Sequence, residues 1–511
     1  MSVALAKCLL ALLIERVHRF QAFLDEVSPL CTNSELQLVA LYQALLDSVE
    51  VEEIKPSAIA LSLLSQGAEE ETSQDIINTV VPMLLITSVE LDTLLAAADV
   101  FPRLQPRPES YEFVEGLFPA NVYENSALAI VLWSDYNFGE LELRGYLIEK
   151  MKETIAALGV ELEAAEGTAA ERRLTTLQLK PIVLYLAQLE KGNPLMWVPL
   201  AHEVGHSIEE ERKISATVIT GLHSKLNLEP EEAATELDFL KSWLPEFISD
   251  EIALRVLGPS YYCAFATFSI LEPSPMDKPS THPPPWNRLE MMKQHCTLPR
   301  TEDIINYFAK LVSEKRQWDE KLSGSQPIEL TIVDWVDVYN EVKRQVENLA
   351  GDIDAIGHPS WETSMTLATE RLRHALPVSS SVQGGNEQLK SMNELVLQIM
   401  HKVSELGVQT TPQEDAVVQG LMKRLDESID NYRERPCEPN EIVGAGWFEK
   451  KTQLEEFSRD FLRDLQSFTP VKQWEVLDER VKQWKSRSTL IDSLLIKSLE
   501  ITPILRLFGG A

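Results

Sequence analysis

The segment AHEVGHSIEEE, residues 201–211, places His202 and His206 four positions apart, with Glu203 directly after the first histidine. Residues four apart lie on one face of an α-helix, so the segment predicts a helix whose two imidazoles point the same way. Two imidazole nitrogens can then reach one metal ion at roughly 2.0–2.1 Å. The carboxylate of Glu203 can reach a water at that metal without binding the metal itself, which is the general-base position of this motif.

The same five residues have a plainer interpretation, in which the two histidines are hydrogen-bonded into polar surroundings on an ordinary helix. A catalytic zinc site needs three protein ligands and one open position, so a third ligand on a second helix would separate the two interpretations. Gly205, beside the second histidine, costs helix stability, about 1 kcal/mol against Ala. It leaves room for the close approach of a substrate or a neighbouring element.

The segment WLPEFISDEIALRVLG, residues 243–258, offers the third ligand. Glu246 and Asp250 are four apart, so Glu246 can bind the metal while Asp250 accepts a hydrogen bond from the far nitrogen of a ligating histidine. Pro245 is expected in the first turn of this helix. An acidic, solvated face is the alternative, but the helix is apolar over much of its surface and is therefore expected to be buried. Buried carboxylates need a cation or donors, and a metal supplies the cation.

HEVGH followed by PEFISDEIA resembles the gluzincin metallopeptidases, in which HExxH supplies two metal ligands and an ExxxD helix supplies the third. THPPPWNRLEMM, residues 281–292, resembles a loop of the group that includes the membrane-bound CAAX prenyl protease and the HtpX-type quality-control proteases. The resemblance covers about residues 195–292. This sequence lacks the membrane helices of that group of proteases. The long helical regions on either side of residues 195–292 resemble no known family.

The resemblance implies one zinc ion per chain and a role for each matching residue. His202, His206 and Glu246 would bind the zinc, Glu203 would be the general base, and Asp250 would support a ligand histidine. His282 and Arg288 match the proline-containing loop and would lie near the cleft.

The tetrahedral oxyanion of peptide hydrolysis needs a hydrogen-bond donor. His282, held by prolines, is one candidate catalytic residue, and Tyr261 or Tyr262 in GPSYYCAF is another candidate cleft residue. Packing is the alternative for the tyrosines, and a surface turn for His282. Arg288 either pairs with a carboxylate near the site or is a surface arginine. A His295–Cys296 nucleophilic dyad is not expected, because adjacent residues point apart on a helix.

Charge and cysteine usage limit the partners and the compartment. The net charge of −32 argues against nucleic acid or an anionic membrane surface as a partner, because phosphate binding needs an excess of Lys and Arg. The five cysteines are far apart, odd in number and without a CxxC pair, which favours a reducing compartment, the cytoplasm.

Apolar runs give no expected membrane segment. The N-terminal run has only about six residues before Glu15 and Arg16, so no secretory signal is expected. The most apolar later window, from Val80, is interrupted by Glu90 and Asp92, short of the roughly 20 residues of a span.

The chain of 511 residues is expected to be mainly α-helical and to hold two or three domains. The expected parts are an N-terminal helical region (1–105), a zincin-like catalytic domain (106–300), a helical extension (301–378) and a C-terminal helical module (388–511). SALAIVLWSDYNF and ELELRGYLI could supply one or two short strands, whereas residues 172–224, including LKPIVLYLAQLEKG, are expected to form successive helices. Residues 272–286 are too rich in proline to be helical, and a polar break is expected at 376–388.

These patterns predict a soluble zinc metalloendopeptidase that acts on a protein or peptide. The alternative from another class is a noncatalytic helical interaction or scaffold protein with a structural or vestigial metal site. In that case the helical flanking regions would bind a protein partner, although packing within the chain explains them first.

Overall fold

The computed structural model describes residues 3–31, 33–64, 70–96, 104–118, 126–133, 139–141, 180–222, 232–271, 282–296, 301–323, 334–349, 416–431, 437–461 and 465–509, with a few short pieces between them. The fold is mainly α-helical, as predicted, and the described residues form one three-stranded sheet. The predicted polar break at 376–388 lies outside the described residues.

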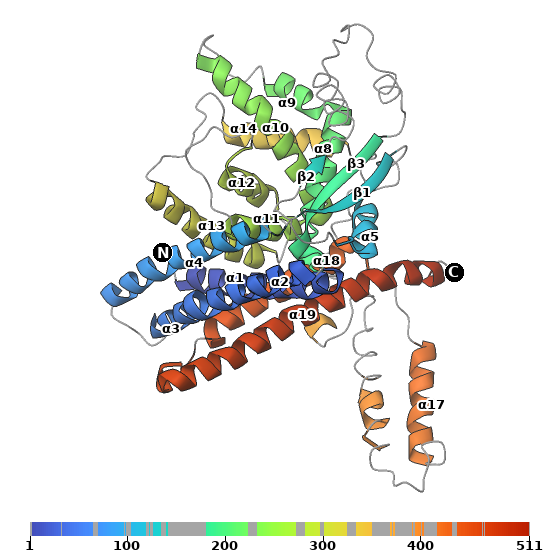
Figure 1. Cartoon of the computed structure of the whole chain (residues 1–511). Helices are drawn as coiled ribbons and strands as arrows, with labels where there is room; N and C mark the ends of the chain where they lie inside the picture. The colour runs from blue at the N-terminus through green and yellow to red at the C-terminus, as the bar shows by residue number, and fades with distance from the viewer. Residues whose placement is uncertain are drawn as a thin grey trace.

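The N-terminal region is helical, as expected. Its helices are α1 (Val3–Val27), α2 (Asn33–Val49), α3 (Lys55–Leu64) and α4 (Glu70–Ala96), with short turns η1 (Ser28–Leu30) and η2 (Glu50–Ile54). The sequence of α1 is apolar on nearly every face, and the helix is buried almost all round. It packs against α4 and the C-terminal helix α19 (Pro470–Gly509), so both ends of the chain share one hydrophobic core (Figure 1).

The sheet has the strand order β1-β3-β2. Strand β1 (Ser126–Trp133) lies in the first segment that could supply a strand, and β2 (Gly139–Leu141) overlaps the start of the second, ELELRGYLI. Strand β3 (Lys180–Ala187) pairs parallel with β1, from Ser126 opposite Lys180 to Trp133 opposite Ala187, and antiparallel with β2.

The predicted helix through LKPIVLYLAQLEKG was therefore wrong, because its first half is the central strand β3. A short apolar run reads equally well as a buried strand or a buried helix, and periodicity does not separate them. Lys180–Ala187 forms a strand because it is hydrogen-bonded to β1 on one side and to β2 on the other. The helical part is limited to the single turns η5 (Gln188–Glu190) and η6 (Pro194–Met196).

Beyond these turns the chain enters the helices that carry the predicted site. They are α8 (Leu200–Arg212), α9 (Ile214–Leu222), α10 (Glu232–Leu257), α11 (Pro259–Leu271) and α12 (Pro285–His295), followed by α13 (Glu302–Ser323) and α14 (Trp335–Glu347). Helix α8 packs along α10 and also contacts β3. The HEVGH helix is thus held between the central strand and the helix that carries Glu246.

Two proline predictions need correction. Helix α10 begins at Glu232, so Pro245 lies inside the helix and not in its first turn. Interior proline removes a backbone hydrogen bond, and the packing of α10 on α8, α11 and α14 offsets this cost. Pro285 and Trp286 open α12, although residues 272–286 were expected to be irregular. Proline is tolerated there because the first helical position has no hydrogen-bond partner for an N–H.

The C-terminal helices do not all belong to one body. Helix α18 (Pro439–Glu456) and α19 pack with α5 (Pro108–Leu117), α1 and the turns η7 (Phe457–Phe461) and η8 (Leu465–Ser467), and they contribute Ile442 and Leu495 to the shared core. Helix α17 (Ala416–Asn431) stands apart from the main body (Figure 1). The predicted domain boundaries remain predictions.

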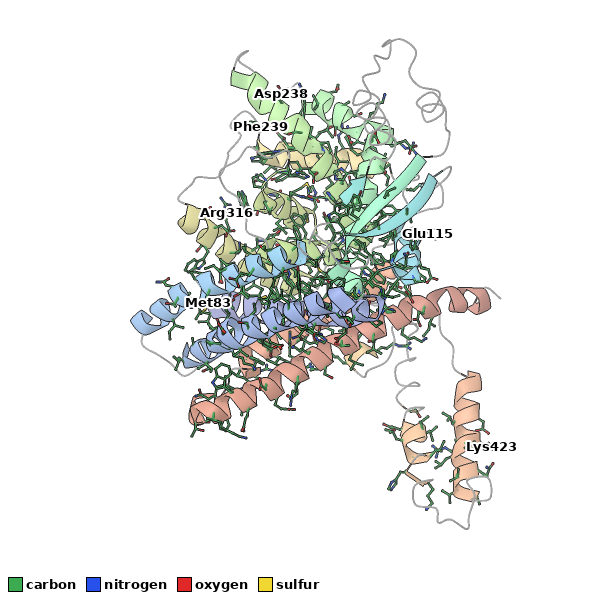
Figure 2. The ribbon with its side chains drawn as sticks, viewed as in Figure 1. Met83, Glu115, Asp238, Phe239, Arg316 and Lys423 are labelled. Atoms are coloured by element: carbon green, nitrogen blue, oxygen red, sulfur yellow. The ribbon has the colours of Figure 1, made fainter. Side chains whose placement is uncertain are left out.

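One segment of the described chain, Ile76–Leu95 in α4, is long and apolar enough to span a membrane. Length and composition do not distinguish it from a core helix. Asp92 in this segment forms an ion pair with buried Arg16 of α1. Ser88 donates a hydrogen bond to the Leu271 carbonyl at 2.8 Å. Figure 2 shows side chains on α4 and the neighbouring helices filling the space between them.

Gly205 sets the distance between α8 and α10. A Cβ atom at this position would lie 2.9 Å from Ser249 Cα and 3.1 Å from the Ser249 carbonyl oxygen. Both obstructing atoms belong to the backbone, so they cannot move aside without shifting α10. The absent side chain of Gly205 therefore lets α10 approach α8 closely. Of the two roles expected for it, room for a substrate or for a neighbouring element, the structure shows the second.

We predict that Gly205→Ala lowers the free energy of unfolding by about 1–3 kcal/mol, because an overpacked contact outweighs the better helix propensity of alanine. Gly192→Ala is the control, since a Cβ there meets no atom within 4 Å. Its effect should stay within about 0.5 kcal/mol. Chemical denaturation of both variants measures this difference, and equal stability would contradict the assignment.

Candidate metal centre

Three predicted ligands, His202, His206 and Glu246, come together between α8 and α10. One candidate ligand atom from each lies within 4.8 Å of the other two. It is the only group of three or more His, Cys, Asp or Glu side chains in the described part of the chain with metal-binding spacing. The first two ligands are one turn apart on α8, and the third comes from the facing turn of α10.

The distances between these atoms match a tetrahedral site. His202 Nε2 and His206 Nε2 are 3.0 Å apart. Glu246 Oε2 is 3.3 Å from His202 Nε2, and Glu246 Oε1 is 3.5 Å from His206 Nε2. Tetrahedral ligands at 2.0–2.1 Å from one ion are separated by about 3.3 Å. The donor atoms thus stand close to the spacing that a metal requires.

The group is buried on one side and open on the other. The His202 and Glu246 side chains are 7% and 9% exposed, whereas His206 is 25% exposed. His282 is mostly exposed, and its Nε2 lies 3.2 Å from Glu246 Oε1. His206 and His282 therefore mark the side from which solvent reaches the group.

Asp250 supports His202 as predicted from the spacing. Its Oδ1 lies 2.9 Å from His202 Nδ1, on the ring nitrogen opposite the one that faces His206 and Glu246. Asp250 is fully buried. A hydrogen bond from Nδ1–H to this carboxylate fixes the ring orientation and turns Nε2 toward His206 and Glu246. Arg288 Nη2 also lies 3.3 Å from Nε2.

Tyr261 lies behind the group and not in an open cleft. Its side chain is buried, its hydroxyl donates a hydrogen bond to Asp250, and its ring stacks on His202 with centroids 6.1 Å apart and planes 9° apart. Gly258, with a φ of 56°, makes the turn from α10 to α11 that brings Tyr261 back beside Asp250. Of the two interpretations of Tyr261, a cleft residue or packing, the structure shows the packing contacts.

Arg288 pairs with both carboxylates from α12. Its Nε and Nη2 donate to the two Asp250 oxygens at 2.8 and 2.6 Å, and its Nη1 lies 3.1 Å from Glu246 Oε2. The guanidinium is buried and also stacks over Phe265. Of the two interpretations of Arg288, the pairing with carboxylates is the one observed.

The surrounding charges shift the pKa values in opposite directions. Burial and Arg288 lower the pKa of His202, but Asp250 and Glu246 outweigh them and raise it to about 9. Burial and the neighbouring His202 lower the pKa of His206 to about 3. Burial opposes ionisation of Asp250, yet Arg288 and His202 bring its pKa down to about 2. The same two cations hold the pKa of Glu246 well below its usual range.

Glu203 is buried on α8, one position after His202. Burial and the Asp250 charge raise the pKa of Tyr261, and the charge of Glu203 adds to this effect. The Glu203 carboxylate is therefore within electrostatic reach of Tyr261. Glu203 directly follows the candidate ligand His202 on α8 and is not one of the three candidate ligands.

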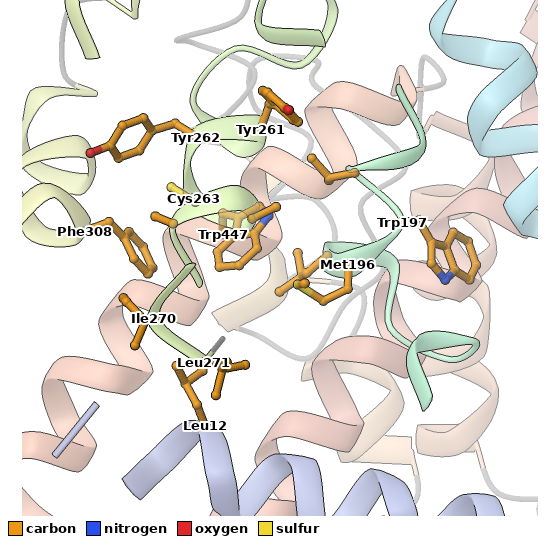
Figure 3. Packing of buried hydrophobic residues seen from close by; sticks show 14 of the residues in the cluster. Leu12, Met196, Trp197, Tyr261, Tyr262, Cys263, Ile270, Leu271, Phe308 and Trp447 are labelled. Atoms are coloured by element: carbon orange, nitrogen blue, oxygen red, sulfur yellow. The ribbon is translucent and has the colours of Figure 1, made fainter. Parts of the chain in front are cut away.

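The structure does not bring every candidate to the group. Tyr262 points away from Tyr261 and lines a cavity between α12, α13 and α14 (Figure 3). Tyr262 was expected as a possible cleft residue, but it does not join the metal group, because consecutive residues of a helix face different ways. His295 Nδ1 contacts Glu251 Oε2 at 2.6 Å, and Cys296 is buried, its pKa raised by that burial.

Comparison with protein-family models, with curated proteins and with solved structures finds no match to this chain. The case for the site therefore rests on the residues and their geometry.

We predict that Arg288→Gln lowers the stability of the metal-free protein by about 3–5 kcal/mol, because it leaves buried carboxylates without their cation. Zinc should raise the thermal unfolding midpoint of this variant by more than it raises that of the original chain, since the ion supplies the missing charge.

Arg459→Gln is the control, because Arg459 is 66% exposed and pairs with a surface aspartate. Thermal unfolding with and without zinc measures all three proteins. An Arg288→Gln protein as stable as the control would show that Arg288 does not neutralise the carboxylates.

Proposed function

We propose that this chain is a zinc-dependent metalloendopeptidase of the gluzincin type that cleaves a protein or peptide. The convergence of His202, His206 and Glu246, with Glu203 beside them on α8, carries the proposal. Two imidazoles and one carboxylate are the donor set of many catalytic zinc sites. A purely structural zinc site usually has four protein ligands, and three leave one position open for chemistry.

The charge states of the donor side chains and the hydrogen bond that orients His202 also suit zinc binding. Neutral His206 and ionised Glu246 are ready to bind, and Asp250 holds His202 with Nε2 toward the other two ligands. When bound, zinc would lower the pKa of a water molecule and polarise the carbonyl of the peptide bond to be cleaved.

The residues of the chain would supply the proton transfers and the positioning. Glu203 would take a proton from the attacking water and pass it to the leaving amine. Asp250, Arg288 and Tyr261 would hold His202 and Glu246 in place through the contacts described above. His282, on the exposed side, is the remaining candidate to donate a hydrogen bond to the oxyanion.

We predict that Glu203→Gln retains one zinc per chain and loses peptide cleavage, because the amide keeps the shape of the side chain but cannot accept the proton. His202→Ala should lose the metal as well as the activity. Metal analysis together with cleavage of a denatured protein substrate measures both. Unchanged cleavage by Glu203→Gln would remove Glu203 from the mechanism.

The same pair of variants separates the enzyme from a noncatalytic helical scaffold with a structural metal. If zinc is bound but neither the original chain nor Glu203→Gln cleaves any peptide, the scaffold is favoured. Because the flanking helices can restrict access to one partner, a library of unfolded substrates should be used.

We predict that zinc binding releases about one proton at pH 7.5. A histidine with a pKa of about 9 carries a proton at that pH and must lose it to bind metal. The apparent affinity should therefore fall about tenfold for each pH unit below 9 while other groups keep their charge. No proton from His206 is expected, since its lowered pKa keeps it neutral.

Titration calorimetry in two buffers with different heats of ionisation measures the released proton. Asp250→Asn is the control, because it removes the hydrogen-bonded charge that raises the pKa of His202. This variant should release fewer protons at the same pH. A zinc affinity that is independent of pH from 6 to 8 would contradict the assigned protonation state of His202.

A further inference from the structure

A cavity lies on the other side of α12 from the metal group. Its volume is about 410 Å³, within the range of roughly 300–1,000 Å³ typical of small-molecule sites. Its walls come from α11, α12, α13 and α14. None of the predicted metal ligands lines it.

Helix α12 divides its residues between the two sites. Arg288, Met291 and Met292 are buried on the core side, and Arg288 reaches the carboxylates of the metal group. Trp286, Glu290 and Lys293, spaced four and three apart, line the cavity on the other face. The cavity is therefore separate from the metal group, although one helix connects them.

Aromatic rings form much of the cavity wall. Tyr262, Trp286, Trp335 and Tyr339 all line it. Trp335 and Tyr339 are stacked with centroids 5.8 Å apart, and the Tyr339 hydroxyl donates to the Asn287 carbonyl at 3.0 Å. These contacts hold two of the rings in fixed positions, which suits the wall of a site for a flat aromatic group.

Tyr262 supplies an unused polar group at this wall. Its side chain is 1% exposed, and its hydroxyl has no hydrogen bond to any described residue. Figure 3 shows the ring leaving α11 in a different direction from Tyr261. A hydroxyl on a residue that lines a cavity can donate its hydrogen bond to a molecule bound there. The Tyr262 hydroxyl is therefore a donor that a ligand oxygen in the cavity could accept from.

The charged lining favours an anion. Two cations, Lys293 and Arg316, line the cavity with one anion, Glu290, in a chain whose net charge is −32. Lys293 forms no ion pair within the described part of the chain, whereas Arg316 Nε donates to Glu320 Oε1 at 2.8 Å and its other guanidinium nitrogens remain to face a ligand. Arg316, labelled in Figure 2, lies over the Trp286 ring at 5.2 Å, which directs its guanidinium along the cavity wall.

We propose that this cavity binds an aromatic group that carries a carboxylate, either a free aromatic acid or the C-terminal aromatic residue of a peptide. The ring packs against Trp286, Trp335 and Tyr339. The carboxylate binds near Lys293 and Arg316, and the Tyr262 hydroxyl donates a hydrogen bond to a ligand oxygen. The proposal does not depend on the presence of a metal or on peptidase activity.

Titration calorimetry with N-acetyl-L-tryptophan tests the proposal, and N-acetyl-L-tryptophanamide is the matched probe without the carboxylate. The acid should bind to one site per chain about tenfold more tightly than the amide, because a charged acceptor gains more from Lys293 and Arg316. Equal binding of acid and amide, or no binding of the acid, would overturn the proposal.

Variants locate the bound probe. Tyr262→Phe should weaken binding about three- to tenfold, the loss expected for one hydrogen bond. Ala309→Leu places a larger side chain on the cavity wall and should abolish binding. Lys310→Gln is the control for Arg316→Gln, because it removes the same charge from an exposed position of α13 that does not line the cavity. Circular dichroism confirms that each variant is folded.

Arg316→Gln should weaken binding of the acid and leave binding of the amide unchanged. Full affinity in both Tyr262→Phe and Ala309→Leu would place the probe elsewhere and overturn the proposal. A tetrapeptide ending in tryptophan with a free carboxylate distinguishes the two sources. Tighter binding than the free acid supports the end of a peptide as the occupant, and weaker binding supports a free aromatic acid.

Discussion

The metal group depends on how closely α8 approaches α10. At Gly205 the backbone of one helix meets the backbone of the other at Ser249, at a distance that leaves no space for a Cβ atom. This contact lies one residue before His206 and three residues after Glu246. Because both helices are rigid, the approach at one point fixes the separation of the ligands on either side of it. A wider contact would leave three polar side chains without the spacing that a metal requires.

Close approach also creates an electrostatic demand. Glu246 and Asp250 are buried together, and two buried carboxylates are unfavourable without cations or hydrogen-bond donors. Arg288 and a protonated His202 meet this demand in the metal-free protein. A metal would replace the His202 proton, so metal binding, protonation and stability should change together. The helices α11 and α12 are needed because they bring Tyr261 and Arg288 to the carboxylates.

Much of the ligand geometry could be predicted from the sequence because it follows from helix periodicity. The four-residue spacings of His202 and His206, and of Glu246 and Asp250, give shared faces without knowledge of the fold. Pairing between the two helices could not be derived this way, since it depends on packing between segments distant in the sequence. The same limit explains Tyr261, whose position beside Asp250 requires the turn at Gly258.

Other errors came from local patterns that tertiary contacts override. KPIVLYLA is as apolar as a buried helix, and only its pairing with β1 and β2 makes it a strand. Pro245 reads as the start of a helix, yet α10 continues through it because packing on both sides supports the helix. The cavity beside Tyr262 could not be foreseen, because its walls come from four helices spread over about eighty residues.

The most direct measurement is anomalous diffraction at the zinc absorption edge from crystals grown with zinc. One strong anomalous peak per chain is expected, about 2.0–2.1 Å from His202 Nε2, from His206 Nε2 and from one oxygen of Glu246. Asp250 should remain on His202 Nδ1, and Glu203 should lie near the peak without contacting it. A peak at other residues would contradict this assignment. So would well-ordered His202, His206 and Glu246 side chains with no anomalous peak between them.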